Sequence, residues 1–129
     1  MGEGLTVLVV DDEPDVCWAL ATLLRTHQFN VVTAVSGAEA LRWVTTSRSQ
    51  CDLILVDAKL TDIDGVELAR RIRSETPCKA PMIMVSGYFY KDDGVVQDTL
   101  RSGLVSAFVT KPFRHGEMLS TIETVLSRG

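Results

Sequence analysis

The sequence predicts a doubly wound α/β fold built on one parallel sheet, and three observations lead there. Five short runs rich in apolar and β-branched residues are separated by polar or turn residues. Segments with apolar residues at helical spacing lie between these runs, so strand and helix alternate five times. Runs such as Leu-Thr-Val-Leu-Val-Val are typical of strands buried on both faces of a parallel sheet. The predicted strands are residues 5–10, 31–34, 53–56, 82–85 and 107–109.

The first helix follows the first strand. Asp12 and Glu13 place carboxylates near its positive end, and Pro14 stands where a missing N–H costs nothing. The apolar residues then recur at intervals of three and four, which puts them on one face of the helix. This face is formed by Val16, Leu20, Leu23, Leu24 and His27.

Four further helices are predicted in the same way. The second begins at Ser36-Gly37-Ala38-Glu39, which resembles a capping box. We interpret Trp18 and Trp43 as partly buried residues of the first two helices. The apolar faces of the later helices are Leu41 and Val44; Leu68, Ala69 and Ile72; Val96 and Leu100; and Met118, Ile122, Val125 and Leu126.

Length and composition indicate a single domain over residues 1–129, with no output domain in this chain. The sequence is 46% hydrophobic with a net charge of −4, so it lacks the signature of disorder. It also lacks a clustered Lys/Arg stripe, which argues against direct binding of nucleic acid or of an anionic membrane surface.

Cysteine usage and the lack of a signal peptide or membrane-spanning stretch predict a cytoplasmic protein. Cys17, Cys51 and Cys78 are odd in number and widely spaced, so we expect reduced thiols rather than a zinc site or a disulfide framework. The sequence shows neither a signal peptide nor an apolar stretch long enough to span a membrane.

Polar residues of defined chemistry follow four of the five predicted strands. In open α/β sheets, ligands bind outside the carboxyl ends of the strands. The sequence therefore brings three Asp carboxylates, a hydroxyl and an ammonium group to one rim. They belong to Asp11 and Asp12, Asp57, Ser86, and Lys111.

These groups together predict a magnesium-dependent phosphoryl-acceptor site. Converging carboxylates repel one another unless a cation lies between them, and oxygen ligands favour a hard cation such as Mg²⁺. Asp57, alone at the end of its strand, is the expected nucleophile, since a carboxylate can form an acyl phosphate. Lys111 and the Ser86 hydroxyl are expected to bind phosphoryl oxygens.

Four separated segments of the sequence resemble the motifs of response-regulator receiver domains. The resemblance implies a flavodoxin-like strand order of 2-1-3-4-5 and phosphorylation of Asp57 by a histidine kinase or phosphotransfer protein. It further implies that Asp12 ligates Mg²⁺ directly and Asp11 mainly through water, and that the backbone carbonyl of Ala58 is another ligand. The segments are residues 9–14 (VVDDEP), 53–65 (LILVDAKLTDIDG), 85–87 (VSG) and 109–113 (VTKPF).

The sequence departs from the family pattern at three places. Leu60 and Thr61 stand where the family often has Met-Pro, which predicts a less rigid loop after the acceptor. The stretch between Ser86 and Lys111 is a few residues longer than expected, which leaves the start of the fourth helix open. The switch position three residues before Lys111 is Phe108 rather than the frequent Tyr.

The family resemblance also suggests how the signal is relayed and how long it lasts. Ser86 and Phe108 are the expected switch residues, acting on the face of the fourth helix, fifth strand and fifth helix, where a homodimer could form. Lys59, two residues past the acceptor, and Tyr88, two past the serine, are expected to shield the phosphoryl group from water. Apart from catalysing its own aspartyl phosphorylation and dephosphorylation, the chain is not expected to be an enzyme.

Three other functional classes compete with this hypothesis. A haloacid-dehalogenase phosphatase also uses Asp, Ser/Thr, Lys and Mg²⁺, but its nucleophile follows the first strand and a second Asp lies two residues on, where this chain has Lys59. A flavodoxin-like cofactor binder needs a phosphate-binding loop after the first strand, and three acidic residues there would repel phosphate. A pseudo-receiver that acts without phosphorylation is the third.

Overall fold

One parallel sheet forms the centre of the protein, as predicted. The computed structural model describes residues 1–46, 50–87 and 94–128. Its strands lie in the order β2-β1-β3-β4-β5, so the chain crosses from one side of β1 to the other after β2. The strands are β1 (Thr6–Val10), β2 (Asn30–Ala34), β3 (Leu53–Asp57), β4 (Met82–Ser86) and β5 (Ala107–Thr110).

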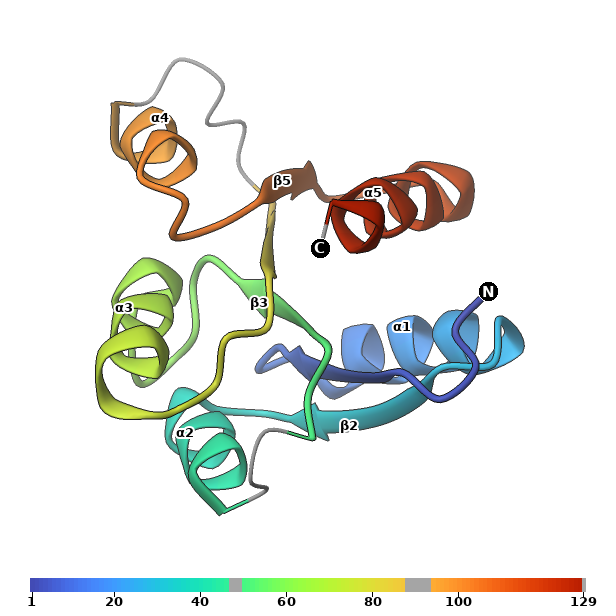
Figure 1. Ribbon diagram of the computed structural model, residues 1–129, viewed down its shortest axis with the longest axis horizontal. Coiled ribbons are helices and arrows are strands. Elements are labelled where there is room, and N and C mark those ends of the chain that lie inside the picture. Colours follow the sequence, from blue (N-terminus) through green and yellow to red (C-terminus); the bar gives the residue numbers. More distant parts are fainter. Residues whose placement is uncertain (47–49, 88–93, 129) are drawn as a thin grey trace.

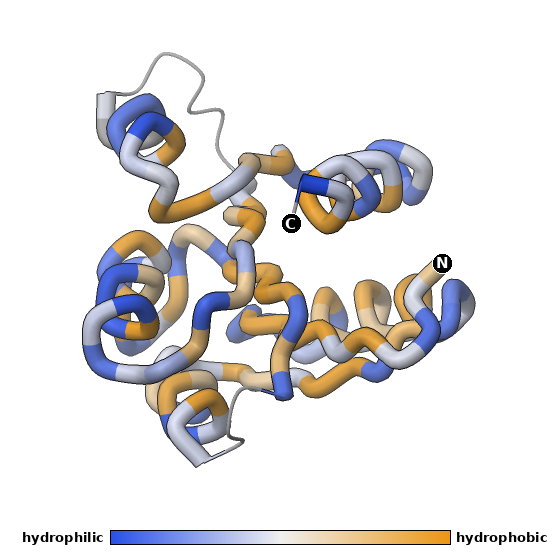
Figure 2. Tube along the Cα trace, viewed as in Figure 1, coloured by the Kyte–Doolittle hydropathy of each residue, from blue (hydrophilic) through white to orange (hydrophobic). Residues whose placement is uncertain are grey.

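Helices cover both faces of this sheet. In Figure 1, α1 and α5 lie on one side of the strands, and α2, α3 and α4 lie on the other. Figure 2 shows hydrophobic residues concentrated along the central strands that the helices enclose. The helices are α1 (Pro14–Thr26), α2 (Gly37–Thr46), α3 (Gly65–Glu75), α4 (Gly94–Arg101) and α5 (His115–Ser127).

Two apolar cores result from the alternation of side chains along each strand. Val7 and Val9 of β1 pack with the inner faces of α1 and α5. Leu8 and Val10 point to the opposite side and pack with α2 and α3. Both faces of β1, β3 and β4 are therefore buried, which is why their sequences are continuously apolar.

Two details of the predicted helices are wrong. The first helix ends at Thr26, because the chain turns at His27 and Gln28 then adopts a positive φ of 69°. Trp18 is 70% exposed, since it lies on the side of α1 opposite the buried apolar face. Trp43 of α2 does pack against the core, as predicted.

The helix starts follow the sequence signals. Pro14 is the first residue of α1. The Ser36 hydroxyl accepts a hydrogen bond from the Glu39 backbone N–H at 3.1 Å, which is one half of the predicted capping box at α2. Asp64 caps α3 by accepting a hydrogen bond from the Val66 N–H at 2.9 Å.

Within the described ranges, no helix has the length and apolar character needed to cross a membrane.

Candidate functional site

Strand register brings the predicted residues to one edge of the sheet. Val10 of β1 lies opposite Val56 of β3. Asp11, which follows β1, and Asp57, the last residue of β3, therefore lie at the same level of the sheet. Asp57 in turn lies opposite Val85, the residue before Ser86.

The last strand completes this edge. Ser86 of β4 lies opposite Thr110 of β5, and its carbonyl accepts a hydrogen bond from the Lys111 N–H at 2.6 Å. The carboxyl ends of β1, β3, β4 and β5 therefore contribute the site, as the sequence predicted.

Four carboxylates converge at this edge. Asp11, Asp12, Glu13 and Asp57 each offer an oxygen, and these oxygens lie within 4.8 Å of one another. Asp11 and Asp57 are buried, with 2% and 7% of their surface exposed. Glu13 belongs to the acidic run noted in the sequence, and the structure adds it to the cluster.

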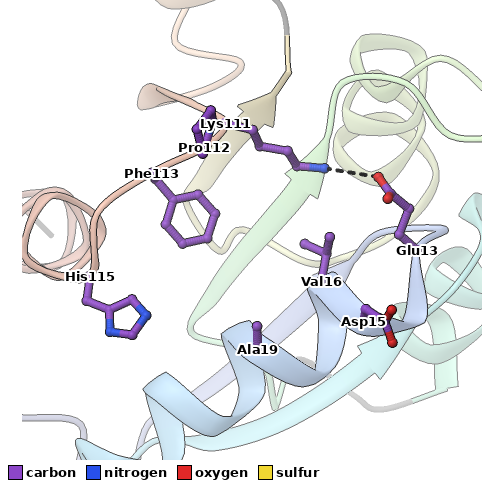
Figure 3. Close-up of a pocket in the computed structure, with 8 residues that line it drawn as sticks. All are labelled: Glu13, Asp15, Val16, Ala19, Lys111, Pro112, Phe113 and His115. Carbon is purple, nitrogen blue, oxygen red and sulfur yellow. Dashed lines mark ion pairs between the residues drawn. The ribbon is translucent and has the colours of Figure 1, made fainter.

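Lys111 forms ion pairs with three carboxylates of this site. Its Nζ lies 2.8 Å from an Asp11 oxygen, 3.4 Å from an Asp57 oxygen and 3.9 Å from a Glu13 oxygen; the pair with Glu13 is drawn in Figure 3. Burial by itself would lower the pKa of Lys111, but the hydrogen bond and charge of Asp11, together with the charge of Asp57, raise it. The ammonium group therefore stays charged at neutral pH.

Asp57 lies in surroundings that disfavour its negative charge. Burial and the charge of Asp11 raise its pKa, while hydrogen bonds from the Lys59 N–H and the nearby Lys111 oppose this shift. Two lysines, Lys111 and Lys59, accompany four carboxylates at this edge of the sheet. The donor set is all oxygen and carries excess negative charge, which suits a hard divalent cation such as Mg²⁺.

Backbone groups orient the two buried carboxylates. An Asp11 oxygen accepts a hydrogen bond from the Glu13 N–H at 2.9 Å. An Asp57 oxygen accepts one from the Lys59 N–H at 3.2 Å. Both carboxylates therefore keep a defined orientation toward Lys111, as a phosphoryl-transfer site requires.

Ala58, unlike Asp12 and Asp57, is predicted to bind the metal through its backbone carbonyl. Its carbonyl accepts a hydrogen bond from the Gly65 N–H at 2.8 Å, at the start of α3. A cavity of about 260 Å³ opens among the acidic residues, and Ala58 is not among the described residues that line it. The cavity is lined by Asp12, Glu13, Asp57, Lys59, Ser86, Gly87 and Lys111.

Among the described residues, two of those predicted to act as the switch or to shield the phosphoryl group line this cavity. Ser86 is buried and Lys59 is exposed, and both line it. Phe108 is half-buried and packs against the apolar core that includes Leu68, Ala69 and Ile72 of α3. Tyr88 falls outside the described residues.

A second hollow adjoins the acidic cavity. It occupies about 510 Å³ between the start of α1 and the segment that joins β5 to α5. Val16, Ala19 and Phe113 give it an apolar floor, and His115 stands at one end (Figure 3). Glu13 and Lys111 line both hollows, so a molecule in this groove lies next to the acidic cluster.

The loop after Asp57 makes contacts that the sequence did not reveal. The Thr61 hydroxyl donates a hydrogen bond to an Asp12 oxygen at 2.6 Å. The Asp62 carboxylate accepts hydrogen bonds from the N–H groups of Gly37 and Ala38, at 2.9 and 3.0 Å. Side chains thus hold a loop that was expected to be less rigid because it lacks proline.

All three cysteines are free and buried. Cys51 and Cys78, which the sequence separates widely, are side-chain hydrogen-bond partners at the opposite end of β3. This interaction lowers the pKa of Cys78 and raises that of Cys51.

Comparison with known proteins identifies the family. The family model described as the response regulator receiver domain matches residues 7–123. The chain belongs to this family. Its receiver-domain match includes every predicted site residue, from Asp11 to Lys111. A haloacid-dehalogenase phosphatase or a flavodoxin-like cofactor binder is therefore not the class of this protein.

The similar curated proteins are longer regulators. The receiver domain is 36% identical to the transcriptional regulatory protein PrrA of Mycobacterium bovis over 99% of this chain and 54% of PrrA. It is 32% identical to the probable transcriptional regulatory protein TcrX of Mycobacterium tuberculosis, over 98% of this chain and 52% of TcrX. The chain thus spans about half the length of these two relatives.

Solved structures show the same fold. A CheY-like receiver domain protein from Methanospirillum hungatei superposes with a TM-score of 0.83 at 27% identity, covering 96% of this chain and 94% of the other. The response regulator TrrA from Thermotoga maritima, crystallised in complex with Mg²⁺-BeF, has a TM-score of 0.76 at 29% identity, with coverage of 94% and 98%.

Proposed function

We propose that this receiver domain is a phosphorylation-dependent switch of a two-component system, in which Asp57 accepts a phosphoryl group from a histidine kinase or a phosphotransfer protein. The observation that carries the proposal is the buried Asp57 carboxylate, which lines a cavity together with acidic groups and lies 3.4 Å from the ammonium group of Lys111. Structural positioning and charge neutralisation are the main requirements of phosphoryl transfer, and this cavity offers both.

Asp12, Asp11 and Asp57 are the side chains that we propose to hold Mg²⁺. When bound, Mg²⁺ supplies the positive charge that lets an incoming phosphoryl group approach the carboxylates. The Mg²⁺-BeF complex of the related TrrA supports this assignment. The Ala58 carbonyl remains a proposed further ligand, since its oxygen has a second lone pair besides the one that accepts the hydrogen bond from the Gly65 N–H.

The reaction itself requires little further machinery. An Asp57 oxygen attacks phosphorus, the bond from phosphorus to the donor breaks, and the donor leaves with that electron pair. Lys111 and the Ser86 hydroxyl then bind oxygens of the new phosphoryl group. The chain catalyses only its own phosphorylation and dephosphorylation and is not an enzyme acting on another substrate.

The groove beside the cavity is where a donor protein would make contact. It reaches Lys111 and Glu13, and its apolar floor between α1 and the β5–α5 segment is open to solvent. We propose a cytoplasmic protein partner here, with no direct role for nucleic acid or membrane.

Phosphorylation is proposed to move Lys111 and the switch residues Ser86 and Phe108. Lys111 now lies closer to Asp11 than to Asp57, at 2.8 against 3.4 Å, so a phosphoryl group on Asp57 would draw it across the cavity. Ser86 moves toward the same group, and Phe108 turns into the space it leaves. The face of α4, β5 and α5 changes as a result, which is a population shift driven by contacts made only in the phosphorylated state.

Beryllofluoride, a phosphoryl mimic, tests this proposal. With Mg²⁺ present, it should shift the amide resonances of the loops after Asp11 and Asp57 and also those of β5 and α5. Removal of Mg²⁺ by a chelator is the control and should abolish both sets of shifts. Shifts confined to the metal loops would rule out the relay through Phe108, while an absence of any shift would rule out the acceptor site. Sedimentation of the same samples would detect a homodimer formed through the α4-β5-α5 face.

The lifetime of the phosphorylated state is proposed to depend on Lys59 and Tyr88. Lys59 is exposed at the cavity wall, where its long side chain can lie against phosphoryl oxygens. Tyr88, two residues past Ser86, carries a ring bulky enough to cover the approach of water. Neither side chain is a good base for activating that water at neutral pH.

Opening this path should accelerate hydrolysis. We expect Lys59→Asn with Tyr88→Glu to increase the dephosphorylation rate about tenfold, which corresponds to about 1.4 kcal/mol of activation free energy. The measurement is the loss of the phosphoryl adduct by intact mass after the donor is removed. Lys79→Asn, at an exposed lysine on the opposite end of the sheet, is the matched control and should keep the parent rate. An unchanged rate in the double variant would show that the two side chains do not shield the phosphoryl group.

A further inference from the structure

The aspartates of the acidic cluster differ in their hydrogen-bonding partners. Asp11 accepts from the Glu13 N–H and from Lys111, at 2.9 and 2.8 Å. Asp57 accepts from the Lys59 N–H at 3.2 Å and lies 3.4 Å from the Lys111 Nζ. Asp12 differs, because the hydrogen bond recorded for its side chain within the described residues comes from Thr61.

The contact between Thr61 and Asp12 has the geometry of a strong hydrogen bond. The Thr61 Oγ1 lies 2.6 Å from the Asp12 Oδ2. This distance falls in the range of a hydroxyl that donates to a charged carboxylate, a bond roughly twice as strong as one between neutral groups. It restricts the carboxylate plane of Asp12, and within the described part of the chain this bond leaves the other oxygen, Oδ1, to face a cation.

The protein fixes Thr61 from both sides. Leu60, the preceding residue, is 9% exposed and belongs to the apolar core. Asp62, the following residue, is bound to the first two N–H groups of α2, and these bonds lower its pKa. The Thr61 hydroxyl is therefore presented to Asp12 by a short segment that is held at each end.

We infer that Thr61 is a positioning residue for Mg²⁺, because its hydroxyl orients the Asp12 carboxylate for metal binding. The inference rests on the proposed function, since it takes the acidic cluster to be a Mg²⁺ site. Groups that orient a metal ligand through a hydrogen bond commonly change metal affinity by about 10- to 100-fold when they are removed. Thr61 stands where the family often has a rigid proline. Its side chain instead acts directly on the metal ligand Asp12.

Mg²⁺ titration of the full chain, followed by amide chemical shifts, tests the inference. Thr61→Val keeps the side-chain shape but removes the hydroxyl, and we expect it to weaken Mg²⁺ binding about tenfold. Thr61→Ser keeps the hydroxyl, so we expect it to bind Mg²⁺ with an affinity close to that of the parent. Thr45→Val is the matched control: its hydroxyl donates to a helix carbonyl at 2.7 Å, far from the cluster, and its loss should leave the affinity unchanged.

The same substitution in an Asp12→Ala protein distinguishes an effect on the orientation of Asp12 from a general effect on the fold. In an Asp12→Ala protein, the ligand that Thr61 orients is gone, so Thr61→Val should cause no further loss of Mg²⁺ affinity. An equal tenfold loss in both backgrounds would overturn the inference, as would a Thr61→Ser protein that binds as weakly as Thr61→Val. Thr61→Ala serves in place of Thr61→Val if the latter does not fold.

The outcomes for the two proposals are distinguishable. If the parent chain binds Mg²⁺ and Thr61→Val binds it equally well, the role of Thr61 is wrong and the proposed function stands. If the parent chain itself shows no Mg²⁺ binding, the metal site of the proposed function is wrong.

Discussion

Replacing Asp57 with Asn should abolish phosphorylation of this chain. With Mg²⁺ and a small donor such as acetyl phosphate, the parent protein should gain one phosphoryl group, which intact-mass measurement detects. The variant should gain none, because an amide lacks the anionic oxygen that attacks phosphorus. Removal of Mg²⁺ should have the same effect on the parent chain, since the carboxylates would then repel the donor.

A loss of folding would not explain this result. The raised pKa of Asp57 means that the folded protein favours its uncharged form, so its charge at neutral pH reduces stability. We therefore expect Asp57→Asn to maintain or raise the free energy of unfolding without Mg²⁺. Asp52→Asn is the matched control: this carboxylate accepts a hydrogen bond from the Thr6 N–H at 2.8 Å, next to the first residue of β3, and its loss should leave phosphorylation intact. A phosphoryl adduct that persists in Asp57→Asn would mean that another residue is the acceptor.

Substituting Gly65 with Ala should damage both the fold and the site. A Cβ at this position would lie 2.3 Å from the Asp57 carbonyl oxygen and 2.8 Å from the Ala58 Cα. Both are backbone atoms that cannot turn aside, so the chain beside the acceptor must shift. We expect a loss of about 1 to 3 kcal/mol in the free energy of unfolding, measured in urea, and slower phosphorylation of Asp57.

Gly116→Ala provides the matched control for this substitution. Gly116 lies in α5, and a Cβ there would meet nothing within 4 Å. Alanine is the better helix former by about 1 kcal/mol in a helix interior, so this variant should be as stable as the parent or slightly more so. Equal stability of the Gly65 and Gly116 variants would show that the backbone around Asp57 accommodates the extra methyl group.

Most of the fold could be predicted because its determinants are local. Runs of β-branched residues identify strands, and the spacing of apolar residues identifies helices, so the five predicted strands differ from the observed ones by only one residue at either end. The errors were also local in origin. Helical periodicity alone does not reveal that the chain turns at His27, and a large aromatic side chain such as Trp18 was taken as partly buried although its position on α1 faces solvent.

The sequence by itself determined which chemical groups gather at the carboxyl edge of the sheet, because all parallel strands end on the same side. Asp11, Asp57 and Lys111 follow three such strands, and their meeting did not depend on any detail of the loops. Only the tertiary structure decided how these groups pair: Lys111 lies nearer Asp11 than Asp57. It likewise brought Thr61 to Asp12, 49 residues away. Such pairings depend on loop conformation and side-chain direction across the fold, which no local pattern of residues encodes.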